Sequence, residues 1–222
     1  MVSVTTRADL VEWFRVREVV GADLGPSWNV APGRTLYVVA PSRAGLRLGT
    51  MQWGLVPSWS AGPGSGPRPI NARAESLTEK PVFAEAAARR RCIVPADGFY
   101  EWDSERLPFH LAAPDGAPLA FAAVWDRWVP PEGDPLLTVV VVTTAANSDV
   151  APLHDRMPAV LPRSAWARWL DPGAVEGGDA RAVLRPAPAG SLVVRPASRS
   201  VNNVANDGPE LLVPSDPPAR LF

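Results

Sequence analysis

Cysteine is almost absent from this chain, since Cys92 is the only one among 222 residues. A single cysteine excludes an intrachain disulfide and a zinc site built from several thiolates. Histidine is also scarce, with only His110 and His154, so we expect no histidine-rich metal site and predict no metal or cofactor. The formal net charge is −1, so a nucleic-acid partner would have to bind a local basic patch.

Long apolar runs are missing too. The most apolar stretch, "LLTVVVVTTAA", is shorter than the roughly 18 residues that span a membrane. The first residues, "MVSVTTRADLVEWF", are polar and contain no apolar core of a signal peptide. We therefore expect a cytoplasmic protein without a membrane partner. A chain of 222 residues can form one domain, and we expect a monomeric single domain over residues 1–222.

The element pattern predicts an α+β fold. Short apolar strands follow one another without regular βαβ alternation, which argues against a doubly wound parallel sheet and favours an antiparallel core. Helices are predicted at 6–16, 80–91 and 162–173, and the tail from about 214 to 222 is expected to be frayed. Strands are predicted at 35–41, 45–57, 92–102, 107–113, 118–128, 136–146 and 192–198.

Two candidate residues lie in "RRRCIVPADGFYEW". Cys92 stands in an apolar run with no histidine nearby in sequence, so we interpret it as a buried scaffold residue. Glu101 lies between Tyr100 and Trp102. Desolvation between two aromatic residues would raise its pKa and suit acid/base chemistry. Strand alternation allows a second interpretation, in which Glu101 faces solvent while both aromatic residues face inward.

Two further polar motifs also leave alternatives open. In "PLHDRMP", His154 is either a proton carrier or a residue that braces a tight loop. In "PINARAE", the period-two spacing of Asn71, Arg73 and Glu75 predicts that all three face one side of a strand, toward solvent or toward a phosphate or sugar. His110, in "LPFHLAA", is predicted to be an ordinary strand residue.

Trp59, at the end of "WGLVPSW", could be exposed and stack on a nucleobase, or it could lie in the core.

Six motifs occur together in a fixed order: "WNVAPG", "WGLVPSW", "PINARAE", "RCIVPADGFYEW", "LHDRMP" and "VNNVANDGPEL". In these motifs the chain resembles the SRAP family (SOS-response-associated peptidase), whose members include abasic-site processing proteins also described as binding 5-hydroxymethylcytosine. The resemblance runs from about residue 3 to about 214. It implies a compact domain around an antiparallel, barrel-like sheet with a positively charged cleft for single-stranded DNA.

The resemblance implies covalent capture of abasic sites in single-stranded DNA. In the family, an N-terminal cysteine forms a Schiff base with the sugar aldehyde through its amine, and its thiol then closes a thiazolidine ring. An internal cysteine has its nitrogen in a peptide bond, so Cys92 cannot perform this reaction. The resemblance assigns Asn71, Glu101 and His154 to catalysis. It assigns Arg73, Arg156 and Lys80 to phosphate contacts, Trp59 and Pro32 to apolar wedges, and Arg199 and Asn202 to support.

The chain departs from the family at its beginning. Met1 aligns about three residues after the position of the family's cysteine, and the Cys-Gly-Arg segment is absent. We expect that the native start lies slightly upstream, because Asn71, Glu101 and His154 are retained; a variant without the aminothiol is the alternative. Three functions therefore stay open: an abasic-site crosslinking enzyme with possible lyase and autopeptidase activity, a non-covalent module for single-stranded or damaged DNA, and a cysteine-type peptidase.

Overall fold

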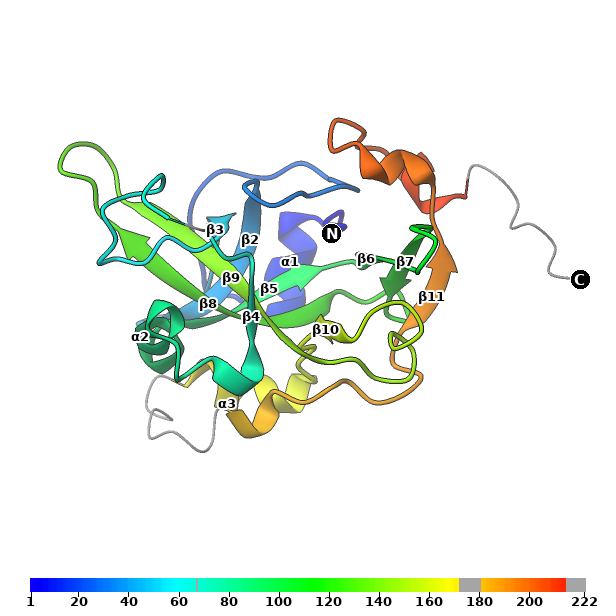
Figure 1. The fold of residues 1–222 in the computed structure, drawn as a ribbon. Helices are drawn as coiled ribbons and strands as arrows, with labels where there is room; N and C mark the ends of the chain where they lie inside the picture. The colour runs from blue at the N-terminus through cyan, green and yellow to red at the C-terminus, as the bar shows by residue number, and fades with distance from the viewer. Residues whose placement is uncertain (67, 172–180, 215–222) are drawn as a thin grey trace, which may run out of the picture.

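Five strands close into a barrel in this computed structural model, which describes residues 1–66, 68–171 and 181–214. Neighbours pair antiparallel in the order β3-β2-β5-β8-β9, and β9 returns to β3 through two parallel pairs, Gln52 with Thr138 and Trp53 with Val139. The predicted α+β fold with an antiparallel, barrel-like core is therefore confirmed (Figure 1). The barrel strands are β2 (Thr35–Ser42), β3 (Gly45–Trp53), β5 (Arg91–Ala96), β8 (Leu119–Trp128) and β9 (Leu136–Ala145).

Short elements surround the barrel. A second sheet has the order β11-β7-β6, and β1, β4 and β10 extend the main sheet. These strands are β1 (Glu18–Val19), β4 (Asn71–Arg73), β6 (Phe99–Trp102), β7 (Pro108–Ala112), β10 (Arg156–Pro158) and β11 (Val193–Pro196). The helices are α1 (Arg7–Phe14), α2 (Pro81–Arg89) and α3 (Trp166–Leu170), and the 3₁₀ turns are η1 (Ala74–Ser76), η2 (Arg163–Ala165), η3 (Arg181–Val183), η4 (Arg199–Asn202) and η5 (Pro209–Leu212).

Strand alternation divides the barrel residues between two apolar cores. On β9, Val140 and Val142 join the core that includes Phe14 of α1, whereas Val139 and Val141 join the other core. All four side chains are buried, because both faces of this strand are covered. Such two-sided burial explains why β9 reads as a continuous apolar run rather than as an alternating pattern.

Sequence signals mark the starts of α1 and α2, but the helices are shorter than predicted: α2 ends at Arg89, and the segment predicted as one helix at 162–173 contains η2 and the five-residue α3. Thr6 caps α1, and its Oγ accepts a hydrogen bond of 3.2 Å from the backbone N–H of Asp9. Pro81 occupies the first turn of α2. Arg91 starts β5, yet its buried guanidinium returns to α2 and donates to the carbonyl oxygens of Ala87 and Ala88. The tail predicted to be frayed lies, from residue 215 on, outside the described residues.

Cys92 is a fully buried scaffold residue. Its side chain lies in the second apolar core at 0 % exposure, and burial raises the pKa of its thiol well above the ordinary value. A reactive cysteine needs partial exposure and a positive neighbourhood that lowers its pKa, so this environment is the opposite. The sequence interpretation of Cys92 as a scaffold residue agrees with this placement.

We expect Cys92→Ala to lower the free energy of unfolding by about 1 kcal/mol through a small cavity. Cys92→Ser should cost more, about 1–3 kcal/mol, because it buries a hydroxyl in an apolar site. Urea unfolding measures both values, and single-stranded DNA binding should remain unchanged in the folded variants. A Cys92→Ala protein that keeps its stability but loses DNA binding would contradict the scaffold role.

Candidate DNA-binding and catalytic site

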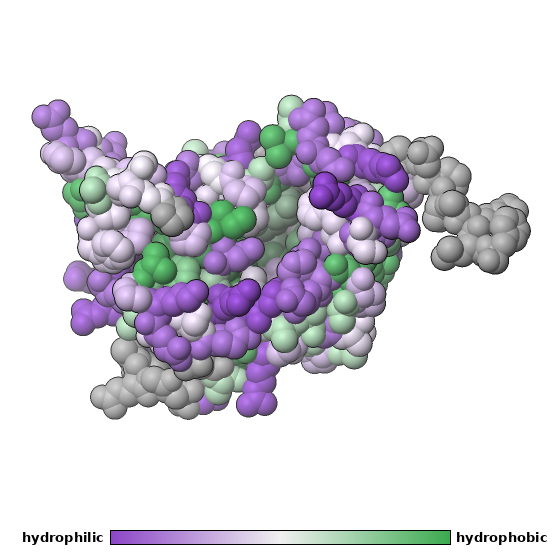
Figure 2. Space-filling view, viewed as in Figure 1, coloured by the Kyte–Doolittle hydropathy of each residue, from purple (hydrophilic) through white to green (hydrophobic). Residues whose placement is uncertain are grey.

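The start of the chain lies in the middle of one face of the molecule (Figure 1). Met1 and Val30 exchange backbone hydrogen bonds, 3.2 Å from the Met1 amine to the Val30 oxygen and 2.8 Å from the Val30 N–H to the Met1 oxygen. The next residue donates from the Val2 N–H to the Gly98 oxygen at 2.9 Å. Figure 2 shows this face hollowed near its middle, with hydrophilic side chains along the edge of the hollow.

Two aspartates anchor the segments that hold the chain start. Asp97 accepts hydrogen bonds from the backbone N–H groups of Val4 at 2.5 Å and Thr5 at 2.9 Å. Asp207 accepts from the N–H of Trp28 at 2.5 Å and from the Ser27 hydroxyl at 2.8 Å. Each carboxylate therefore ties together segments that are far apart in sequence. This anchoring explains why aspartates occur in "VPADGFYEW" and "VANDGPEL". The sequence analysis did not predict this structural role.

Asn29 adds a third anchor to the same segment. Its side-chain amide is buried and donates to the carbonyl oxygens of Val201 at 3.0 Å, Asn203 at 3.2 Å and Asn206 at 3.1 Å. The amide thereby holds the residues around η4 against the segment that pairs with Met1. The asparagine of "WNVAPG" therefore has a structural role.

The α-amine of Met1 has an unusual electrostatic environment. Burial lowers its pKa from 8.0 to about 5, while the negative charges of Asp207 and Glu101 act in the opposite direction. An amine with this pKa is neutral at pH 7 and has a free lone pair. Neutral amines are the nucleophiles that condense with aldehydes, so the environment at the chain start is suited to that chemistry.

Glu101 lies on β6 and is half-buried. Burial raises its pKa, and Asp155 adds to the increase, while the charge of His154 and the chain-terminal amine lower it. The raised pKa matches the first sequence interpretation, in which desolvation prepares this carboxyl for acid/base chemistry. The second interpretation is wrong for Trp102, which is 37 % exposed and donates from its indole N–H to Asn202 at 2.8 Å.

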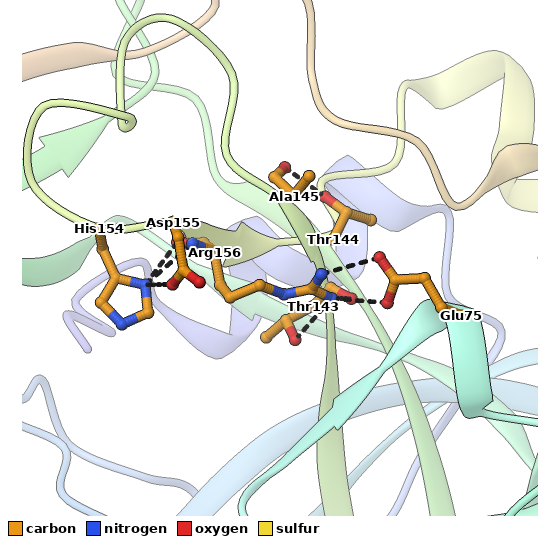
Figure 3. Close-up of polar contacts among 7 residues, drawn as sticks. All are labelled: Glu75, Thr143, Thr144, Ala145, His154, Asp155 and Arg156. Carbon is orange, nitrogen blue, oxygen red and sulfur yellow. Dashed lines mark hydrogen bonds and ion pairs between the residues drawn. The ribbon is translucent and has the colours of Figure 1, made fainter.

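His154 lies in the loop before β10, and its side chain is 49 % exposed. Its Nδ1 accepts a hydrogen bond of 2.9 Å from the backbone N–H of Arg156, and Asp155 Oδ1 lies 3.2 Å from the same nitrogen (Figure 3). The Arg156 oxygen also lies 3.2 Å from Nδ1, so this nitrogen faces one donor and two acceptors. The loop therefore holds the ring through Nδ1.

Four of the residues predicted to bind DNA or react with it line a single cleft of about 940 Å³: Trp59, Asn71, Arg73 and Lys80. Asn71 and Arg73 are exposed on one side of β4 with buried Ala72 between them, as the spacing predicts. Trp59 is 64 % exposed, so the prediction that it could stack on a base is compatible with the structure. Lys80 stands at the N-cap of α2.

Pro32 lies outside the lining of this cleft. It is exposed in the turn before β2, where Gly33 adopts a left-handed φ of +87°. This turn is joined to the cleft wall, because Gln52 donates to the Gly33 oxygen at 2.9 Å and accepts from Arg68 at 2.8 Å. The wedge role of Pro32 stays a prediction.

Glu75 does not share the strand face of Asn71 and Arg73. The strand ends at Arg73, and Glu75 lies in η1, so the three-residue spacing argument was wrong at its last member. Glu75 instead binds the guanidinium of Arg156, which was predicted to contact phosphate.

His110 is a strand residue on β7, as predicted, but it also adjoins the chain start. It pairs with Tyr100 of β6, and burial lowers its pKa to about 4, with the chain-terminal amine and Arg195 adding to the effect.

Among the described residues, no group of three or more His, Cys, Asp or Glu side chains could hold a metal ion. Likewise, no helix within 1–66, 68–171 or 181–214 is long and apolar enough to cross a membrane.

A family model for SOS response associated peptidase (SRAP) matches residues 1–204. The chain belongs to the SRAP family. Among curated SRAP relatives, the abasic site processing protein YoqW of Bacillus subtilis is 34 % identical over 209 residues, covering 92 % of this chain and 93 % of that protein. YedK of Escherichia coli is 33 % identical over 84 % of each chain. HMCES of Gallus gallus is 34 % identical over 74 % of this chain and 56 % of its own.

Solved structures support the SRAP fold as well. A protein from Bacteroides thetaiotaomicron superposes with a TM-score of 0.75 at 25 % identity, covering 82 % of each chain. A protein from Bordetella bronchiseptica superposes with a TM-score of 0.73 at 26 % identity, covering 89 % of this chain and 98 % of that one. These likenesses extend the family match from sequence to the barrel and its surrounding elements.

Proposed function

We propose that this chain processes abasic sites in single-stranded DNA; its curated relatives carry the name abasic site processing protein. The observation that carries the proposal is the position of the buried chain start, which lies near enough to Glu101 for each charge to shift the pKa of the other group, so that residues ahead of Met1 would begin beside this carboxyl. The ring-opened sugar of an abasic site presents an aldehyde. A neutral amine beside a carboxyl with a raised pKa is a suitable pair for condensing with it.

The proposed reaction uses the N-terminal residue of the protein. The amine nitrogen bonds to the aldehyde carbon, and the resulting carbinolamine loses its hydroxyl as water after receiving a proton from Glu101. The product is an iminium. When that residue is cysteine, its sulfur bonds to the same carbon, its thiol proton is released, and a thiazolidine closes. Only a residue carrying both amine and thiol forms this stable five-membered ring.

The backbone around Met1 is compatible with residues placed ahead of it. The described hydrogen bond of the Met1 nitrogen is to the Val30 oxygen. A preceding residue would convert this amine into an amide N–H, which can still donate to Val30. Three added residues, Cys-Gly-Arg, could reach at most about 10 Å from Met1.

The cleft lined by Asn71 supplies the proposed DNA contacts. Arg73 and Lys80 hold phosphates, which positions the strand without reading its sequence. Trp59 stacks on an unpaired base, a contact that any base can make. Asn71 orients the sugar of the lesion. Because the proposed substrate is DNA, we expect the protein to act in the cytoplasm, on the nucleoid.

Two other functions remain distinguishable from this proposal. The chain as written has no N-terminal thiol, which favours non-covalent recognition of the same DNA by this form. Cysteine-peptidase chemistry would have to use Cys92, whose thiol is buried and has a raised pKa. Proteolysis in our proposal is therefore limited to exposing the N-terminal cysteine of a longer chain.

DNA binding through the cleft gives a direct prediction. Arg73→Ala should weaken binding of every single-stranded oligonucleotide tested, and the slope of log affinity against log salt should fall by about 0.7, the value for one lost phosphate contact. Fluorescence anisotropy at several salt concentrations measures both effects.

Arg43→Ala is the matched control, because Arg43 lies in the turn between β2 and β3, at the opposite end of β3 from Trp53. It removes the same charge and should leave the slope unchanged. Equal effects of the two substitutions would show that net charge, rather than a phosphate contact at Arg73, determines binding.

A further inference from the structure

Two polar side chains interrupt an apolar face of the barrel. On this face Val124 of β8 lies opposite Val140 of β9, and the next pair on the same face is Asp126 with Thr138. All four side chains are buried, with Asp126 at 3 % exposure and Thr138 at 0 %. A buried carboxylate or hydroxyl costs free energy unless hydrogen bonds satisfy it, so this pair needs polar partners.

The partners of this pair are backbone groups of the segment 56–60. The Val56 N–H donates to Thr138 Oγ1 at 2.9 Å, and the Ser58 N–H donates to Asp126 Oδ2 at 2.9 Å. The segment lies outside the strands and runs beside the end of β8 and the start of β9 (Figure 1). The two side chains therefore supply acceptors that a neighbouring strand would otherwise provide.

The carboxylate of Asp126 is itself held on its other side. Its Oδ1 accepts a hydrogen bond of 2.7 Å from the Arg127 N–H and lies 3.2 Å from a terminal nitrogen of Arg90. Arg90 follows the end of α2 and also lies 3.0 Å from Glu85 of that helix. One carboxylate oxygen thus faces the segment 56–60, and the other faces the barrel and α2.

The far side of Trp59 is held as well. Trp128, two residues after Asp126 on β8, donates from its indole N–H to the Ser60 oxygen at 2.9 Å. The Ser60 N–H closes a turn by donating to the Pro57 oxygen at 3.0 Å. Trp59 lies within this turn. Its backbone is therefore fixed on both sides, while its ring is 64 % exposed and lines the cleft.

We propose that Asp126 and Thr138 are positioning residues for Trp59: they hold the segment 56–60 against the barrel, so that the ring stands at the cleft before an unpaired base arrives. The inference deepens the proposed function and rests on it for the stacking contact. A ring whose backbone is already fixed loses less freedom on binding, so more of its stacking free energy remains as affinity. Neither Asp126 nor Thr138 is among the residues that line the cleft, so both act through the segment.

Charge and position predict opposite effects of Asp126→Ala. If only the local electric field matters, removing a negative charge should strengthen DNA binding. If Asp126 positions Trp59, the variant should weaken binding of single-stranded oligonucleotides by about 3-fold or more, a part of the roughly 5-fold to 150-fold loss expected for Trp59→Ala. Thr138→Val keeps the charge and the branched shape, removes the acceptor for Val56, and should also weaken binding. The salt dependence should stay unchanged in both variants, because no phosphate contact is lost.

A double-mutant cycle, measured by fluorescence anisotropy, separates positioning from a general loss of structure. In a Trp59→Ala background, Asp126→Ala and Thr138→Val should have no further effect on affinity, because the ring that they position is gone. In an Arg73→Ala background, both should keep their full effect. Cys92→Ser is the control for lowered stability, since it disturbs a buried site in the other apolar core and should leave affinity unchanged.

The ring itself can be observed by ¹⁹F NMR in protein labelled with 5-fluorotryptophan. The chain has nine tryptophans, and Trp59→Phe identifies the Trp59 resonance by its disappearance. We expect Asp126→Ala and Thr138→Val to move this resonance toward the position of free 5-fluorotryptophan in water. Cys92→Ser should leave it in place.

The outcomes decide the inference and the proposed function separately. An unmoved Trp59 resonance in the folded variants, or equal losses of affinity with and without the Trp59 ring, would overturn the positioning role. Thr138→Val carries the test alone if Asp126→Ala does not fold. If Trp59→Ala leaves DNA binding unchanged, the stacking contact of the proposed function is refuted, while the resonance still decides whether the pair positions the ring.

Discussion

A protein that begins Met-Cys-Gly-Arg ahead of Met1 should form a heat-stable adduct with abasic single-stranded DNA, and the chain as written should form none. The difference is expected to be nearly complete, because a thiazolidine needs an amine and a thiol on one residue. The amine of Met1 can form an iminium, but this product hydrolyses or promotes strand cleavage by β-elimination. The family resemblance also places it about three residues short of the reactive position, which is at most about 10 Å of extended chain.

The measurement is a denaturing gel after heating, using a uracil-containing oligonucleotide treated with uracil glycosylase. A Met-Ser-Gly-Arg extension is the matched control, since it restores the length and the arginine without the thiol. An adduct with the serine form, or with the chain as written, would show that a different group captures the lesion. No adduct with the cysteine form, after removal of its initiator methionine is verified by mass, would also contradict the account.

Glu101→Gln in the extended protein should slow adduct formation by at least about 100-fold, within the range for loss of a general acid or base. The amide keeps the size of the side chain and removes its ability to give a proton to the departing hydroxyl. Rapid-quench sampling of the adduct on gels measures the rate. The control is Glu105→Gln, which makes the same chemical change at an exposed position outside the strands. Gln52→Glu is unsuitable, because Gln52 contacts Arg68.

The pH dependence of adduct formation follows from the direction in which the pKa of Glu101 is shifted. Burial raises the pKa of this carboxyl above its ordinary value of 4.5, so the acid form persists to higher pH than in a free side chain. The rate should therefore decline as pH rises through the raised pKa, and this decline should be missing in Glu101→Gln. A parallel pH profile in the two proteins would mean that Glu101 is not the proton donor.

The sequence pattern predicted correctly those features of the site that depend only on residues close together in the chain. Asn71 and Arg73 share one face because strand alternation holds over the three residues of β4. Cys92 is buried because its strand is apolar on both faces. Glu75 was misplaced because the strand ends after Arg73, and no residue pattern in "NARAE" marks that end. The error therefore arose at an element boundary.

The remainder of the site depends on contacts between distant parts of the chain. Arg156 finds Glu75 across 81 positions, so its engagement was not visible in "LHDRMP". The place of Met1 depends on Val30, Asp97 and Asp207, which meet only in the folded barrel. His110 acquires its lowered pKa from burial beside the chain start. Such effects follow from tertiary structure and lie beyond spacing arguments.

The most direct test of the account is the location of the crosslink. The adduct of the extended protein should be digested after glutamate and analysed by mass spectrometry. We predict that the DNA remnant is carried by the N-terminal peptide that ends at Glu12, attached to its first cysteine with the loss of one water. A remnant on the peptide containing Cys92, or on Lys80, would contradict the claim that the start of the chain is the reactive group.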